Sequence, residues 1–382
     1  DGAVTIDGAV VLTSDVSGTG NDGKVDFSTT IAGDNTSETG SLATDSLTIE
    51  TGAGTLTLSG SIGAADGDHL DALYINDTAG ADYTANITIP QIGTHGTRAG
   101  VQGITTIGNA NTGTVTFGSG GHQFSGGQVT ITSAGDIITP LDANITSDDN
   151  IKLDPGTGSL KFSGDFDLVS TGNKTIEIAG NSLAVDSGTS VDTLTIVSGE
   201  GSGATNGTIT MGGTIGSAEL KTVSLTAGTA INLGGNITIG AIADGTVDID
   251  GPAVLTADVT VDADQQNTSI GFTSTINNDG SGTARNLVLD TGAGNISVSG
   301  IIGDVGNSGV AIGTIDINNS DGAGTITLAG IGSSSTAGNA GVVDIGNTAT
   351  ADLNLAGTFF TGGATTYQAD ATGKDIDITA NT

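Results

Sequence analysis

The sequence has no cysteine and no tryptophan, and it has a single methionine and only four prolines in 382 residues. Without cysteine there is neither a disulfide framework nor thiol chemistry. Aromatic residues make up 3% of the chain, so the bulky side chains that usually fill a globular core are scarce. The apolar residues are almost entirely Val, Ile, Leu and Ala, which suit a narrow interior of stacked β-strands.

Basic residues are scarce as well. Eight Lys and Arg stand against 42 Asp and Glu, which gives a formal net charge of −34. Such a surface repels nucleic acid and anionic lipid, so neither is expected as a partner. No apolar run is long enough to insert into a membrane as a helix. These absences favour an ordered, thin, β-rich protein with an acidic exterior.

Two segments that lie 240 residues apart are nearly the same: TGAGTLTLSGSIGA at 51–64 and TGAGNISVSGIIGD at 291–304. Residues 1–16 likewise match residues 244–259 at 11 of 16 positions. The chain therefore reads as a tandem super-repeat of about 240 residues, a period that indicates a repeat architecture. Residues 1–243 form the first copy and residues 244–382 an incomplete second copy, so we expect the natural chain to continue.

A shorter repeat runs inside each copy, as in TLTLSGSIG at 55–63 and TITMGGTIG at 208–216. A five-residue alternating segment is followed by glycine and by an apolar residue. Period two places alternate side chains on opposite faces of a strand, and glycine permits the bend that follows. The residues predicted to point into the interior are Leu56, Leu58, Ile62, Ile209, Met211, Ile296, Val298 and Ile302.

Short strands, glycine bends and internal repeats predict an all-β fold, a right-handed parallel β-helix (β-solenoid) in which each coil pairs with the next. We expect about 20–25 residues in each coil. A string of β-sandwich modules is the alternative, because it also gives evenly spaced strands. A sandwich of this size would normally need more aromatic residues in its core.

The strings GTLTLSGSIG, LTIVSGEG and GGNITIG resemble the strand repeats of filamentous-haemagglutinin-like and autotransporter-type bacterial surface proteins. The resemblance covers most of the chain, but it concerns scaffold positions and carries over no functional residues. It implies a secreted or surface-anchored β-solenoid that serves as a stalk, filament or adhesin.

We therefore expect a non-enzymatic structural protein at the cell surface. One alternative is an adhesin with a glycan- or receptor-binding loop within 64–72 or 140–155. Another is a self-assembling surface-layer or filament subunit whose open ends associate with one another.

A weak calcium candidate is formed by Asp66, Asp68 and Asp71, because clustered carboxylates suit a hard cation. The segment lacks the full twelve-residue calcium-loop pattern, and solvated loops are the simpler interpretation in so acidic a chain. We therefore expect no cofactor, with Ca²⁺ as the one open possibility.

Three histidines, His69, His95 and His122, are spaced by 26 and 27 residues and would form a metal ladder if they stacked on successive coils. The second copy contains no histidine, which argues against a metal that the repeat requires. Carboxylate pairs such as Asp148 and Asp149 could serve a glycosidase. Few basic or aromatic residues are available to hold a sugar, so no enzyme is predicted.

Overall fold

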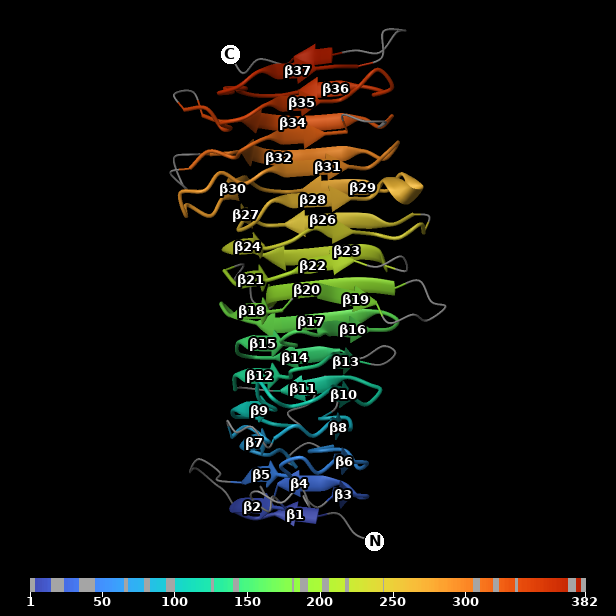
Figure 1. Ribbon diagram of the computed structural model, residues 1–382, viewed down its shortest axis with the longest axis vertical. Coiled ribbons are helices and arrows are strands. Elements are labelled where there is room, and N and C mark those ends of the chain that lie inside the picture. The colour runs from blue at the N-terminus through green and yellow to red at the C-terminus, as the bar shows by residue number, and fades with distance from the viewer. Residues whose placement is uncertain are drawn as a thin grey trace. The chain divides into compact units, whose positions relative to one another are not determined.

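The computed structural model describes residues 4–14, 24–33, 45–64, 68–78, 83–93, 100–124, 127–139, 144–180, 182–185, 192–200, 206–216, 220–242, 244–304, 310–318, 323–333, 336–369 and 376–378. Apart from a 3-10 helix at Asp264–Gln266, the regular secondary structure of this part of the chain is β-strand, and turns and loops join the strands. Parallel strands stack on one another as a β-solenoid (Figure 1), which confirms the predicted fold class. Parallel stacking excludes the sandwich alternative, which is built from antiparallel sheets.

The chain divides into two compact units. Unit 1 contains Asp1–Gly188 and Val197–Ala204, and unit 2 contains Thr189–Ile196 and Thr205–Thr382. Strand β20 (Asp192–Glu200) contributes residues to both. The division falls inside the first super-repeat, so compact units and sequence copies are different partitions of the chain. In the described residues, no helix is long and apolar enough to cross a membrane.

Three walls of parallel strands make up unit 1, and each wall is named here by its first strand. The β2 wall contains β2 (Ala9–Thr13), β5 (Ser46–Glu50), β7 (Ala72–Ile75), β9 (Thr105–Ile107), β12 (Val129–Thr132), β15 (Ile151–Asp154) and β18 (Thr175–Ile178). The β3 wall contains β3 (Val25–Phe27), β6 (Leu56–Leu58), β8 (Ile87–Ile89), β10 (Val115–Phe117), β13 (Ile137–Thr139), β16 (Ser159–Phe162) and β19 (Ser182–Val185). The β1 wall contains β1 (Val4–Ile6), β4 (Ile31–Gly33), β11 (His122–Phe124), β14 (Ile145–Ser147) and β17 (Phe166–Thr171), with isolated bridges at Ile62, Ile92 and Val101.

Unit 2 is built in the same way. The β21 wall contains β21 (Thr208–Met211), β24 (Ala230–Leu233), β27 (Ala253–Leu255) and β30 (Ile276–Asn278). The β22 wall contains β22 (Thr214–Gly216), β25 (Ile237–Thr238), β28 (Val259–Asp262), β31 (Leu287–Asp290), β33 (Ile315–Ile317), β35 (Val343–Ile345) and β37 (Thr365–Tyr367). The β23 wall contains β23 (Leu220–Ala227), β26 (Thr246–Asp250), β29 (Ser269–Phe272), β32 (Ile296–Ile302), β34 (Ile326–Ile331), β36 (Leu353–Leu355) and β38 (Ile376–Ile378).

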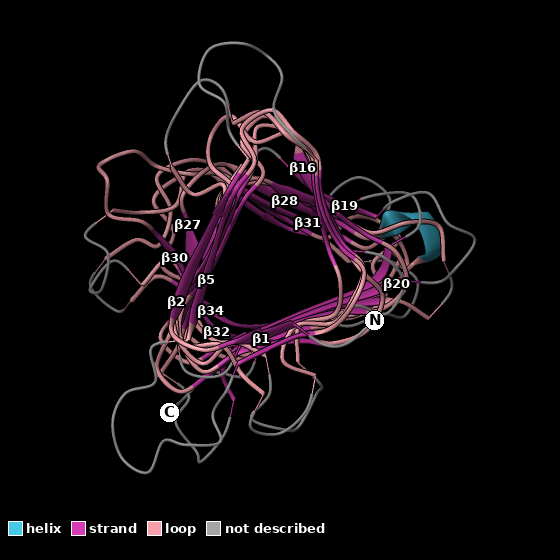
Figure 2. Cartoon of the chain, turned by 90° about the horizontal axis from the view of Figure 1, so that it is seen from below, coloured by secondary structure: helices cyan, strands magenta, loops and turns pink. Residues whose placement is uncertain are grey.

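Seen end on, the strands of a coil form the sides of a triangle, and turns and loops lie at its corners (Figure 2). Coil length follows from the paired residues. Val115 pairs with Ile137, 22 positions later, whereas Val10 pairs with Leu47, 37 positions later. The expected 20–25 residues hold for the coils in the middle of the chain, as between Ile151 and Ile176, whereas other coils are longer. In longer coils the additional residues lie between the walls, and in some of these coils one wall is reduced to an isolated bridge, as at Ile62 and Ile92.

The core consists of apolar columns that run from coil to coil. Val115, Ile137, Leu160 and Leu183 are in register on successive strands of the β3 wall, and each is at most 1% exposed. Full burial of one such side chain stabilises the fold by about 1.5–3 kcal/mol. The eight residues predicted to point inward are all at most 2% exposed: Leu56, Leu58, Ile62, Ile209, Met211, Ile296, Val298 and Ile302.

Aromatic side chains are few, yet several of them fill the interior. Phe162 and Phe166 stack with ring centroids 5.5 Å apart, and both are essentially inaccessible to solvent. Phe117, Phe124 and Phe272 are buried as well. The interior is therefore narrow without being restricted to small aliphatic residues.

Candidate functional site

A buried corner between β5 and β6 carries the polar arrangement that explains the repeated TGAG. Asn76 follows β7 directly and is fully buried with φ of 45°. Its Oδ1 accepts a hydrogen bond from the Thr51 backbone N–H at 2.7 Å, and its Nδ2 donates to Thr51 Oγ1 at 2.9 Å. The amide of one coil thus closes the turn of the coil before it.

The next coil extends this corner. Asn109 Nδ2 donates to the Asn76 carbonyl oxygen at 2.7 Å, and the Asn109 backbone N–H donates to Thr112 Oγ1 at 3.0 Å. All of these residues are at least nine-tenths buried. We call Thr51, Asn76, Asn109 and Thr112 the asparagine corner of unit 1.

Unit 2 reproduces this corner with Thr291, Asn318, Asn347 and Thr350. Asn318 Oδ1 accepts from the Thr291 N–H at 2.8 Å, and Asn318 Nδ2 donates to Thr291 Oγ1 at 2.9 Å. Asn347 Nδ2 donates to the Asn318 carbonyl oxygen at 2.7 Å, and the Asn347 N–H donates to Thr350 Oγ1 at 2.9 Å. Each distance agrees with its counterpart in unit 1 within 0.1 Å. The TGAG segments are therefore similar in the two copies because each belongs to the same hydrogen-bonded corner.

A glycine beside each corner has the same backbone requirement in both units. Gly108 and Gly346 both have φ of 72°, a region that side chains with a Cβ rarely adopt. A Cβ at Gly108 would overlap the Thr132 carbonyl oxygen, and a Cβ at Gly346 would overlap that of Gln368. The adjoining coil therefore approaches too closely for any residue except glycine.

Asparagines that precede strands form a second recurring link between coils. In each case the side-chain Oδ1 accepts a hydrogen bond from the backbone N–H of a threonine in the following coil, at 2.7–2.9 Å. The pairs are Asn86 with Thr114, Asn150 with Thr175, Asn236 with Thr260, Asn286 with Thr314 and Asn295 with Thr325.

His122 is a core residue at the start of β11. The Ile92 N–H donates to its Nδ1 at 3.3 Å, so Nε2 carries the proton and donates to the Gly118 carbonyl oxygen at 3.0 Å. Its ring meets Phe117 edge to face, with centroids 4.9 Å apart. Burial lowers the pKa of His122 to about 4. Both ring nitrogens are thus engaged by the backbone of the protein, which leaves neither for a metal ion.

The other metal candidates do not come together in the described structure. His95 and Asp66 lie outside the described residues, whereas His69, Asp68 and Asp71 lie within them. Asp71 Oδ2 accepts from the Asp45 N–H at 2.8 Å, so this carboxylate links two coils. No group of three or more His, Asp or Glu side chains in the described part of the chain could hold a metal ion.

The carboxylate pair Asp148 and Asp149 also links coils. Asp148 Oδ1 accepts from the Thr171 hydroxyl at 2.9 Å, and Asp149 Oδ1 pairs with Lys174 Nζ at 3.1 Å. These carboxylates thus hold the following coil. Of the two loops expected to carry a ligand site, residues 65–67 and 140–143 fall outside the described residues.

Glu50 is a titratable group that the sequence patterns did not single out. Its side chain is 7% exposed at the end of β5, and Oε1 accepts from the Thr78 hydroxyl at 3.0 Å. Burial is the main cause that raises the pKa of Glu50, and the hydrogen bond with the neighbouring Asp77 carboxyl group adds to the increase. Together they bring the pKa of Glu50 to about 7. A carboxyl group that is buried beside another carboxyl group ionises less easily, so Glu50 changes its protonation near neutral pH.

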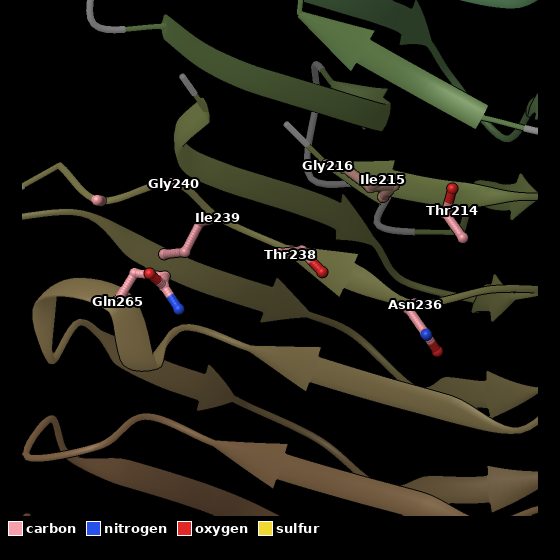
Figure 3. Close-up of a pocket in the computed structure, with 9 residues that line it drawn as sticks. Thr214, Ile215, Gly216, Asn236, Thr238, Ile239, Gly240 and Gln265 are labelled. Carbon is pink, nitrogen blue, oxygen red and sulfur yellow. The ribbon is translucent and has the colours of Figure 1, made fainter. Parts of the chain in front are cut away.

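A hollow of about 500 Å³ lies on the outer side of the β22 wall. Thr214, Asn236, Thr238 and Gln265 supply its polar lining, and no charged residue is among the described residues that line it. Figure 3 shows Thr214 on β22, Asn236 and Thr238 at β25, the first of them directly before that strand, and Gln265 on the 3-10 helix. Hydroxyl and amide groups of this kind can exchange hydrogen bonds with a neutral polar ligand.

Comparison with known proteins gives no relative: no family model, curated protein or solved structure matches this sequence. The two super-repeats share corners and core positions, whereas the histidines occur in the first copy alone.

Proposed function

We propose that this chain is a non-enzymatic structural segment, a rod or stalk, of an extracellular bacterial surface protein. The observation that carries the proposal is the duplication of the asparagine corner. The same four hydrogen bonds recur in the corners that contain Asn76 and Asn318, although many residues between the corners differ. What the two copies share is the apparatus that joins one coil to the next.

The side chains that could act as catalysts or metal ligands support the same proposal. His122 has its two nitrogens on backbone groups, and Asp71 and Asp149 hold adjacent coils. A catalytic side chain must be within hydrogen-bonding distance of a substrate, whereas these side chains form hydrogen bonds and ion pairs with neighbouring coils. Their role is cohesion between coils.

The acidic exterior suits a surface protein exposed to solvent. With 42 acidic and eight basic residues, neighbouring molecules repel one another and stay dispersed. The finer assignment, to filamentous-haemagglutinin-like or autotransporter-type proteins, rests on the strand-repeat strings alone. Immunogold labelling of intact cells that produce the protein tests the location, and label confined to the cell interior would contradict it.

Small-angle X-ray scattering on the purified chain tests the structural role. A rod built of coils advances by about 4.8 Å per coil, so we expect a constant cross-section and a maximum dimension several times larger than the width. The scattering curve of a compact globule would refute the proposal. A parallel assay for release of reducing ends from common polysaccharides should give no activity.

A second candidate function is glycan binding at the hollow on the β22 wall. The uncharged lining of Thr214, Thr238 and Gln265 favours a neutral saccharide. A glycan array with the purified chain tests this function, using the variants Thr238→Val and Gln265→Ala. Thr226→Val, an outward threonine on β23 away from the hollow, is the matched control. Binding that survives both hollow variants would place the glycan site elsewhere.

A further inference from the structure

A buried carboxylate oxygen without a donor lies beside the asparagine corner of unit 1. Glu50 is the last residue of β5, and its side chain is 7% exposed. Its Oε1 accepts a hydrogen bond from the Thr78 hydroxyl at 3.0 Å. Its Oε2 is buried and receives no hydrogen bond from a donor in the described structure. A buried charged oxygen in this condition destabilises the fold unless a positive group reaches it.

The group that faces Glu50 is a second carboxyl group. The Asp77 side chain lies within hydrogen-bonding reach of Glu50. A protonated Glu50 can share its proton with Asp77, but two ionised carboxylates are both acceptors and need a positive species between them. Among the ion pairs of the described residues, none includes Glu50 or Asp77. The protein itself therefore supplies no cation to this pair.

The asparagine corner holds the two carboxyl groups near each other. Glu50 directly precedes Thr51, and Asp77 directly follows Asn76. Two buried hydrogen bonds, of 2.7 and 2.9 Å, join Thr51 to Asn76 across the two coils. The backbones on which the carboxylates stand are thus fixed relative to each other. A site built on such a support is organised before its ligand arrives.

The second copy keeps the corner but not the pair of carboxyl groups. Glu50 corresponds there to Asp290, whose Oδ1 accepts a hydrogen bond from the Gly292 backbone N–H at 3.2 Å. By the repeat alignment, Asp77 corresponds to Asn319, which carries an amide and no charge. The corner therefore does not require two facing carboxylates, and their presence in unit 1 is a separate feature that calls for its own explanation.

The chemistry of this pair suits a hard divalent cation. Ca²⁺ takes roughly six to eight oxygen ligands, and a carboxylate can bind it through one or both oxygens. The Thr78 hydroxyl is a further oxygen at the same place, and water completes the coordination, so a third carboxylate is not needed. Asp77 is half-buried and Thr78 is exposed, which gives an ion access from solvent. Mg²⁺ demands stricter geometry and loses its water reluctantly, so Ca²⁺ is favoured.

We propose that Glu50 and Asp77 bind a Ca²⁺ ion, with the Thr78 hydroxyl as a further ligand. The ion joins the end of β5 to the segment that follows β7, and so links two consecutive coils of unit 1 beside the asparagine corner. It also neutralises two carboxylates of a chain whose formal charge is −34. This site goes beyond the proposed structural role, which does not depend on it.

Isothermal titration of the chelator-treated chain with CaCl₂ tests the proposal, at about pH 8, where fewer protons compete for the carboxylates. We expect one site with a dissociation constant of roughly 10⁻⁴–10⁻³ M, the range of open extracellular calcium sites. The melting temperature should rise with Ca²⁺, because the ion binds the folded state, and it should rise more than with Mg²⁺ at equal ionic strength. No binding would mean that the pair shares a proton only, and would overturn the site.

Variants separate a specific site from general attraction of cations to an acidic protein. Glu50→Gln and Asp77→Asn each remove one ligand charge and should weaken Ca²⁺ binding about tenfold or more. Asparagine already stands at the position of Asp77 in the second copy, so the second variant should fold. Asp248→Asn, which removes the same charge from an exposed carboxylate on β26, is the control and should bind like the parent.

Equal weakening in Asp248→Asn, or equal stabilisation by Ca²⁺ and Mg²⁺ in the parent and in all variants, would reduce the effect to charge screening and overturn the site. A chain that binds no Ca²⁺ but scatters as a rod would refute this inference and leave the proposed function intact.

Discussion

At the scale of single residues, the interior holds amides as well as hydrocarbon. Asn76 and Asn318 are buried, and the side-chain oxygen and nitrogen of each form hydrogen bonds with one threonine of the preceding coil. A buried amide without partners would destabilise the fold, whereas a satisfied one contributes about 0.5–1.5 kcal/mol.

Replacing the corner asparagine should therefore be costly in stability. Asn76→Ala leaves the buried Thr51 N–H without its acceptor, and we expect a loss of about 1–3 kcal/mol in the free energy of unfolding. Asn318→Ala should behave alike through Thr291. Asn232→Ala removes a bond to Thr210 on the outer side of the β21 wall and should change stability by less than about 0.5 kcal/mol. Urea unfolding measures all three, and equal losses would contradict the role of the corner.

His122 should make the protein acid-sensitive. Its pKa is about 4 in the folded protein against an ordinary value of 6.5, so the folded state binds fewer protons than the unfolded state. The stability it contributes is complete above pH 6.5 and is lost as the pH falls toward 4. His122→Gln keeps an acceptor and a donor without titrating. Its melting temperature should fall less than that of the parent over this window, and parallel curves would count against the assignment.

Glu50 should act in the opposite sense. Its pKa rises from 4.5 to about 7 on folding, so the folded state binds more protons, and the stabilisation present below pH 4.5 is lost as the pH rises through 7. Glu50→Gln mimics the protonated side chain, with an amide that can donate to Asp77. We expect its melting temperature to be less sensitive to pH between about 5 and about 8 than that of the parent. Identical pH profiles would show that Glu50 ionises without consequence.

At the scale of the strand, inside and outside alternate with a period of two. Leu56→Asp places a charge in a fully buried column, and we expect it to destabilise the surrounding coils by several kcal/mol, roughly 3–5. Thr88→Asp, at an outward position of the next strand in the β3 wall with threonines on both sides, is the control and should have little effect. Thermal melting followed by circular dichroism distinguishes them. An unchanged melting temperature for Leu56→Asp would refute its inward orientation.

The sequence predicts strands far better than it predicts corners. Alternation identified positions such as Leu56 and Val298 because polarity changes at every step. The corner residue Asn76 is one of many asparagines, and its partner lies 25 positions away along the chain. Coil length decides which residues meet, and it varies from 22 to 37 positions here. The identity of Asn76 with Asn318 and of Asn109 with Asn347 between the copies was the available signal.

The histidines illustrate the same limit. Their spacing suggested a ladder, but spacing alone does not reveal which wall or which side of a wall a residue occupies. His122 instead fits between Ile92 and Gly118 as a polar core residue. Burial and backbone partners depend on the stacked coils, so they become visible only in three dimensions.

At the scale of the whole molecule, charge repulsion is the dominant electrostatic effect. The cations that do form ion pairs mostly tie one coil to the next, as in Lys152 with Glu177 at 2.9 Å and Lys161 with Asp136 at 2.6 Å. Burial would raise the pKa of Asp136, but the hydrogen bonds from Lys161 and the Ser159 N–H outweigh it and lower that pKa. Pairs this exposed contribute little to stability, so they offset a small part of the repulsion.

Salt should therefore stabilise the fold. Screening weakens the repulsion among 42 carboxylates more than it weakens a few ion pairs, and we expect the melting temperature to rise between about 20 mM and about 500 mM NaCl. Sodium chloride and choline chloride at equal ionic strength should act alike. A decrease with salt would mean that the ion pairs outweigh the repulsion.

The coil-to-coil hydrogen bonds have a consequence for how the polypeptide reaches this structure. The Thr51 backbone N–H acquires its acceptor only when Asn76 arrives, and the Asn76 carbonyl oxygen acquires its donor only when Asn109 arrives. Each folded coil has a free strand edge with which the next coil can form hydrogen bonds. The residues of that next coil lie only a few dozen positions later in the sequence. The entropy of closing each loop thus stays the same however long the polypeptide grows. A nascent chain of this design can fold progressively from its beginning, without waiting for its end.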